Sequence, residues 1–156
     1  MKTASRIIIV VLAVAIAVGI AVICIVLTTN KTLKIKLDDS GVTHAELKFS
    51  ANGLLPAESR EYSVVLQAKT SGTYNVTLEF VGENSILGDF VDVTVEYDGG
   101  KAEHSLAEML NGETVEFTCE IAKKSAIKII YTMPEETGNE AQGASADFDI
   151  LLTVVR

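Results

Sequence analysis

The chain of 156 residues contains no tryptophan, two prolines and two histidines. His44 and His104 both fall on the polar phase of their segments, as surface histidines do. No His-Glu-x-x-His sequence occurs, so the helical zinc site of a common metalloprotease cannot form. No Gly-x-Ser-x-Gly sequence occurs either, which excludes a nucleophile turn of that type. The sequence therefore predicts a protein that is not an enzyme and has no cofactor.

Cysteine is scarce as well. Cys24 lies in an uncharged apolar run and Cys119 in an alternating polar segment, so the two cannot pair within one chain. There is no disulfide framework and no Cys-x-x-Cys metal motif. Cys119 falls on the apolar phase of its segment, where we expect a core residue. An exterior domain without disulfides fits the surface of a Gram-positive bacterium better than a eukaryotic one.

Acidic residues are absent before Asp38, although the chain has 21 of them. Only 8 of the 13 basic residues lie from Asp38 onward, so this part carries 21 − 8 = 13 more acidic than basic side chains. Such a surface repels nucleic acid and anionic lipid. It favours solubility, cations or cationic partners, and nucleic acid is not an expected partner.

A long apolar run begins at Ile7, contains Gly19 and ends at Leu27 without a single charge. As a helix it would be ~31 Å long, enough to cross a bilayer once. The run is too long for a signal peptide and has a poor cleavage site, so we expect an uncleaved signal-anchor over 7–27. Residues 1–6 would be a cytoplasmic stub, with the C-terminal domain outside the cell. The alternative is an unusual cleaved signal and secretion to the extracellular matrix.

From residue 33 onward, apolar and polar residues alternate in short segments, the pattern of half-buried strands. Turn residues separate the segments, and Asp98-Gly99-Gly100 is a strong hairpin signal. Ser105 and Glu108 form a capping box for one short helix. We expect an all-β fold, an antiparallel β-sandwich of jelly-roll type over 38–156, with 28–37 as a juxtamembrane segment or first strand. The expected inward sets begin at Leu33, Ala45, Tyr62, Tyr74, Val91, Val115, Ile127 and Phe148.

Acidic pairs are the one possible metal signal. Glu135 and Glu136 share a loop, and Asp147 and Asp149 share a strand face. Calcium prefers six to eight oxygen ligands, and neither pair lies in a known calcium loop. These four residues are weak calcium candidates, and a solvated acidic loop is the favoured interpretation. The aromatic residues fall almost entirely on inward phases, which argues against a sugar-stacking surface.

Two segments resemble a known family. Residues 129–136 read Ile-Ile-Tyr-Thr-Met-Pro-Glu-Glu, residues 138–142 Gly-Asn-Glu-Ala-Gln and residues 146–150 Ala-Asp-Phe-Asp-Ile. Together with Leu-Pro-Ala-Glu-Ser-Arg-Glu-Tyr at 55–62, this is similar to the TasA/camelysin family of Gram-positive surface and biofilm-matrix proteins. The resemblance implies an extracellular jelly roll and, for the best-known members, matrix fibres in which a strand of one subunit completes the sheet of the next. The long apolar run departs from the short cleaved signal of that family.

These observations predict a non-enzymatic structural or adhesive protein of the bacterial surface, a fibre-type subunit that self-associates through sheet edges. The resemblance makes the segment with Leu33, Ile35 and Leu37 the candidate donor strand. The alternative function is a membrane-tethered binding module for calcium or for another surface protein.

Overall fold

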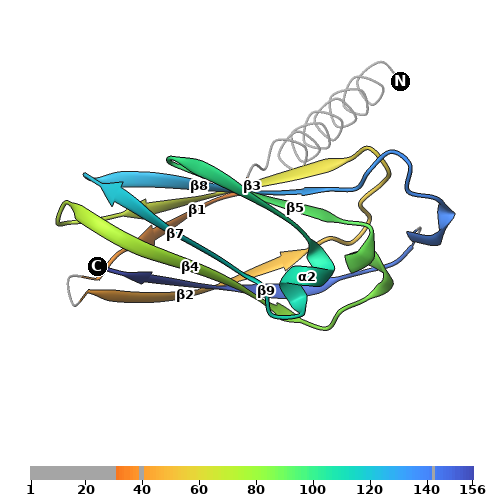
Figure 1. Cartoon of the computed structure of the whole chain (residues 1–156), viewed down its shortest axis with the longest axis horizontal. Helices are drawn as coiled ribbons and strands as arrows, with labels where there is room; N and C mark the ends of the chain where they lie inside the picture. Colours follow the sequence, from red (N-terminus) through yellow and green to blue (C-terminus); the bar gives the residue numbers. More distant parts are fainter. Residues whose placement is uncertain (1–30, 39–40, 142) are drawn as a thin grey trace, which may run out of the picture. The chain divides into compact units, whose positions relative to one another are not determined.

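The computed structural model describes residues 31–38, 41–141 and 143–156. These residues form nine strands in two sheets, and the all-β prediction is confirmed (Figure 1). The predicted span at 7–27 lies outside the described residues. Among those described, no helix is long and apolar enough to cross a membrane.

Five strands form the first sheet, in the order β1-β3-β8-β5-β6, and four form the second, in the order β2-β9-β4-β7. The strands are β1 (Lys31–Lys36), β2 (Val42–Ser50), β3 (Ser59–Gln67), β4 (Gly72–Gly82), β5 (Asp92–Tyr97), β6 (Gly100–Ser105), β7 (Thr114–Ile121), β8 (Lys124–Thr132) and β9 (Asp147–Val155). The described residues also form three short helical turns, namely η1 (Ile86–Asp89), α2 (Leu106–Leu110) and η2 (Asn139–Ala141).

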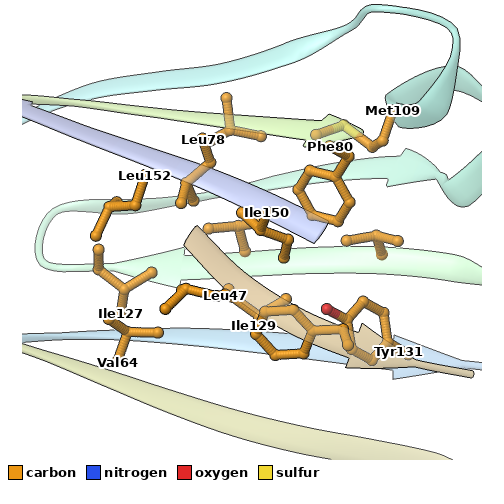
Figure 2. Packing of buried hydrophobic residues seen from close by; sticks show 14 of the residues in the cluster. Leu47, Val64, Leu78, Phe80, Met109, Ile127, Ile129, Tyr131, Ile150 and Leu152 are labelled. Carbon is orange, nitrogen blue, oxygen red and sulfur yellow. The ribbon is translucent and has the colours of Figure 1, made fainter. Parts of the chain in front are cut away.

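Alternation along the strands produces the core. On β9, for example, Phe148, Ile150, Leu152 and Val154 are buried while the residues between them face outward. Figure 2 shows side chains from both sheets meeting in one apolar layer, with Met109 of α2 at its margin. The predicted inward sets are largely confirmed, except that some members at strand ends and edges, such as Tyr62 and Phe117, are half-buried.

One strand pairing differs from the antiparallel prediction. β1 runs parallel to β3, whereas the other described ladders are antiparallel. The cause is the path of the chain, which crosses from β1 to β2 in the opposite sheet and then returns to β3. Two successive crossings reverse the direction twice, so β3 comes back beside β1 with the same direction.

The local turn signals fold as expected. Gly99 adopts a φ of 97° between β5 and β6, a left-handed conformation that suits glycine. The Ser105 hydroxyl accepts from the Glu108 N–H at 3.2 Å, and the Glu108 carboxylate accepts from the Ser105 N–H at 2.9 Å. That backbone hydrogen bond also lowers the pKa of Glu108. Together they hold α2 at the end of β6.

An aromatic cluster joins the sheets at one end of the core. Phe148 stacks on Phe49 and Phe80 of its own sheet, with ring centroids 6.2 and 5.8 Å away. Tyr131 of the other sheet meets Phe148 edge-on at 5.5 Å. Such pairs stabilise beyond the area that they bury. Phe148 therefore links β9 to β2, β4 and β8.

We predict that Phe148→Ala lowers the free energy of unfolding by about 3–5 kcal/mol, because it removes a buried ring and leaves a cavity. The matched control is Ile86→Ala, since Ile86 is 64% exposed on η1 and should change stability little. Urea unfolding followed by circular dichroism measures both. Equal losses in the two variants would contradict a central role for Phe148.

Candidate functional site

The candidate donor strand β1 lies at the edge of the five-stranded sheet. Among the described residues its ladder partner is β3 alone, with Leu33 opposite Val64 and Ile35 opposite Leu66. Leu33 and Ile35 are half-buried against the core, and Leu37 just after the strand is 4% exposed. The three predicted residues therefore share the inner face, as their alternation requires.

The contacts of β1 are one-sided. Its backbone pairs with β3 on one side, and the Leu37 N–H donates to the Gln67 carbonyl at 2.8 Å beyond the strand. Full burial of an apolar side chain stabilises by roughly 1.5–3 kcal/mol, so the two half-buried side chains of β1 together contribute about 1.5–3 kcal/mol. The apolar contacts of β1 therefore hold it to the sheet only modestly.

The two segments that carry the family resemblance meet at one end of the sandwich. Met133 and the loop after β2 exchange backbone hydrogen bonds, from Ala57 N–H to the Met133 carbonyl at 2.9 Å and from Met133 N–H to the Glu58 carbonyl at 3.0 Å. Ala57 has a φ of 65°, which is uncommon for a residue other than glycine. The loops 51–58 and 133–146 thus form one hydrogen-bonded structure, which we call the loop pair.

Asn52 ties the loop pair together. Its side-chain Nδ2 donates to Asp147 Oδ1 at 3.1 Å, and its Oδ1 accepts from the Ala146 N–H at 3.0 Å. Its carbonyl accepts from Arg60 Nη1 at 2.8 Å. No local sequence pattern marks Asn52, because the partners of its side chain are distant in sequence.

Two hollows lie near the loop pair. A shallow depression of about 600 Å³ includes Lys48, Tyr62, Asp147 and Asp149. A smaller pocket of about 310 Å³ has a mostly apolar lining, with small residues beside Leu54, Leu55, Pro56 and Met133. Leu55 is 62% exposed, so the pocket presents an apolar side chain to solvent.

The calcium candidates are dispersed. Glu135 and Glu136 are exposed in the loop after Met133, while Asp147 hydrogen-bonds Asn52 and Asp149 faces outward on β9. Across residues 31–38, 41–141 and 143–156, no group of three or more His, Cys, Asp and Glu side chains could hold a metal ion. The described residues therefore present no ready-made calcium site.

The remaining titratable candidates lie on three different strands, β2, β6 and β7. His44 is exposed on β2, with Nδ1 3.1 Å from Thr153 Oγ1. His104 differs from its predicted polar phase: it pairs with buried Val93 and is half-buried at the sheet edge. Cys119 is buried as predicted, and burial raises the pKa of its thiol.

Tyr131 was predicted only as a core residue, yet its hydroxyl has no hydrogen-bond partner among the described residues. Burial of the hydroxyl is the main cause that raises the pKa of Tyr131 well above its ordinary value, and the nearby Tyr62 adds to the rise. The ring packs against three other aromatic rings, which explains why the side chain is retained in the core without a partner for its oxygen.

Comparison with known proteins gives no family and no curated relative that matches this chain. Similar solved structures include the Aeromonas hydrophila PliG, a periplasmic inhibitor of g-type lysozyme, at 12% identity and a TM-score of 0.38 over 80% of this chain and 97% of that chain. Another is FLHE, at 11% identity and a TM-score of 0.41 over 74% and 96% of the two chains. A third is the C-terminal CBM6 of LamC from Zobellia galactanivorans, at 10% identity and a TM-score of 0.34 over 73% of this chain and 100% of that chain. The TasA/camelysin resemblance stays a prediction.

We predict that Asn52→Ala loosens the loop pair, because it removes two side-chain hydrogen bonds and leaves the Ala146 N–H unpaired. The expected loss in the free energy of unfolding is about 1–3 kcal/mol, with faster hydrogen exchange in residues 143–147. Glu136→Ala, at an exposed position in the same loop, is the control. Unchanged exchange at 143–147 in Asn52→Ala would show that Asn52 does not hold the loops together.

Proposed function

We propose that this chain is a non-enzymatic structural or adhesive protein of the bacterial cell surface that self-associates by β-strand addition. The observation that carries the proposal is β1, a short parallel edge strand held on one side by β3 alone. Such a strand can leave its own sheet at low cost and complete the sheet of a neighbour.

We infer that the sandwich is a jelly roll. Without β1, the strand orders are β3-β8-β5-β6 and β2-β9-β4-β7, so the chain alternates between nested pairs of strands. This supports the arrangement of eight strands in two Greek keys. β1 is then an addition to a complete eight-stranded fold, which favours its role as the exchangeable element.

In strand exchange, β1 of another copy would take the place of a copy's own β1 beside β3. If β1 leaves, the fully buried Val64 and Leu66 lose their partners on β1 but keep those on β8. A β1 from another copy restores the same contacts with Leu33 and Ile35, so the two states differ little in contact energy. Local concentration then sets the balance, as in domain swapping.

The membrane part of the proposal concerns residues 7–27. A retained anchor would hold many copies on one surface, facing outside the cell, and would restrict free fibres. A cleaved segment would release β1 at its N-terminal end and favour export to the matrix. N-terminal sequencing of the mature protein separates these two routes.

A cross-link across β1 and β3 tests the exchange. Lys34 and Val65 are opposite each other on the outer face, at the spacing of neighbouring strands that a disulfide can bridge. We predict that the full chain with Lys34→Cys and Val65→Cys, and with Cys24→Ser and Cys119→Ser, forms covalent ladders at high concentration on oxidation.

The matched control places the cysteines between two strands that the proposal keeps together. Ser59 and Thr132 face each other on β3 and β8, with their hydroxyls 2.8 Å apart. Ser59→Cys with Thr132→Cys in the same background should give cross-linked monomers alone. Cross-linked monomers alone from the Lys34 and Val65 pair would rule out strand exchange.

A second candidate function is a tethered binding module, and the 310 Å³ pocket of the loop pair is the observation that favours it. Its small, apolar lining and the exposed Leu55 suit an apolar side chain of a protein partner. The calcium version has less support, because its four candidate residues are dispersed.

Calcium titration tests the calcium-binding form of this module directly. We predict that the full chain releases no heat with calcium and that its Tm shifts by less than about 1 °C, because a ligand stabilises only the state that binds it. Magnesium serves as the control ion. A calcium-specific rise in Tm that Asp149→Asn abolishes would instead support the binding module.

A further inference from the structure

The outer face of the four-stranded sheet carries several large apolar side chains that are exposed to solvent. Of the six exposed large hydrophobic residues in the described part of the chain, four lie there: Val42, Val81, Leu151 and Val155. Val42 and Val155 are direct partners across β2 and β9. This surface, the outer residues of β2, β9, β4 and β7, is called the acidic face below.

Acidic side chains surround these apolar residues. Leu151 lies between Glu46 and Glu79 in one row across the sheet, and Glu116 follows in the next row on β7. Lys48 is 3.7 Å from Glu46. Glu79 and Glu116 have no basic partner among the described residues, so their charge is uncompensated.

The opposite sheet carries the complementary charge. On its outer side, Lys36, Gln67 and Lys124 form one row across β1, β3 and β8. Lys34, Val65 and Ala126 form the next row. Lys34, Lys36 and Lys124 make no ion pair within the described part of the chain. This surface, the outer residues of β1, β3 and β8, is the basic face.

Other lysines of that sheet are already paired. Lys128 is 3.3 Å from Glu61, and Lys101 is 2.7 Å from Glu103 on β6. The uncompensated positive charge is therefore concentrated at β1 and at the start of β8. These lysines lie beside two apolar residues of the same face, Val65 and Ala126. On the acidic face, the glutamates likewise lie beside Leu151.

We propose that the basic face of one copy docks on the acidic face of a second copy. Val65 and Ala126 would oppose the valines and Leu151, while the lysines approach Glu79 and Glu116. The two faces are on opposite sheets of the sandwich, so a docked pair still has one free acidic face on one copy and one free basic face on the other. Such a heterologous contact continues from copy to copy and does not close as a dimer.

The area of the two faces limits the strength of the contact between copies. With strands ~4.8 Å apart and about eight residues long at ~3.3 Å per residue, the four-stranded acidic face covers roughly 500 Å² and the three-stranded basic face roughly 400 Å². A stable interface buries about 800 Å² on each partner. The contact is therefore weak between free copies and becomes effective where copies are concentrated, as on one surface.

This contact goes beyond strand addition and does not depend on it. Screening shortens the reach of exposed charges from about 10 Å at 0.1 M salt to about 3 Å at 1 M. Face-to-face docking should weaken as salt rises, whereas a strand held by backbone hydrogen bonds and apolar contacts should persist. Lys34→Cys and Val65→Cys also alter the basic face, but covalent ladders still report strand addition, because they require β1 of one copy to pair with β3 of another.

Charge reversal on each face is the test, with the full chain in a neutral detergent and sedimentation as the measurement. Lys36→Glu with Lys124→Glu, or Glu79→Lys with Glu116→Lys, should weaken self-association about tenfold at low salt, since each puts like charges opposite one another. All four changes together reverse both faces and should restore association to within about threefold of the wild type. The rescue distinguishes complementarity from a general effect of charge.

The matched control for the glutamate pair is Glu113→Lys with Glu135→Lys, which makes the same change in net charge at exposed loop positions outside both faces. It should change association less than twofold. The proposal is overturned if the wild type does not associate at low salt, if the control weakens association as much as the face variants, or if the fourfold variant is not rescued. A loss confined to the lysine variant would indicate a polyanion on the basic face, and it too would overturn docking of a second copy.

Discussion

Side-chain packing between the sheets is the constraint on which the fold depends. Within the described residues, no ladder of backbone hydrogen bonds joins the five-stranded sheet to the four-stranded one. Phe148, Tyr131 and the aliphatic side chains in Figure 2 hold the sheets together instead. Cores of this kind are close-packed and resist changes in volume. The inner positions are therefore committed to stability, and function has to use edges, outer faces and loops.

The edge position of β1 follows from that constraint. β3 already supplies Val64 and Leu66 to the core, so the sandwich closes around eight strands before β1 is added. β1 extends the sheet and covers the margin of the core with Leu33 and Ile35. Because β1 adds buried apolar area only at the margin of the core, the other eight strands can stay folded when β1 is exchanged.

Much of this architecture could be predicted from local patterns. Alternation identified the buried phase of β4, β8 and β9, and Ser105 with Glu108 marked α2, because these signals depend on neighbours in sequence. The parallel pairing of β1 could not be predicted, since it depends on which sheet each crossing reaches. The same applies to Asn52, whose partners are 94 and 95 residues away, and to His104, whose phase is set by the ladder to Val93.

Net charge and local charge act over different distances in this protein. The chain carries a formal charge of −8, so free copies repel one another at long range. At contact distance, only the nearest side chains matter, and there the unpaired lysines of β1 and β8 oppose the unpaired glutamates of β4 and β7. Long-range repulsion keeps isolated copies soluble, while short-range complementarity acts only after copies are brought together. An apolar N-terminal segment that gathers copies on one surface would supply that condition.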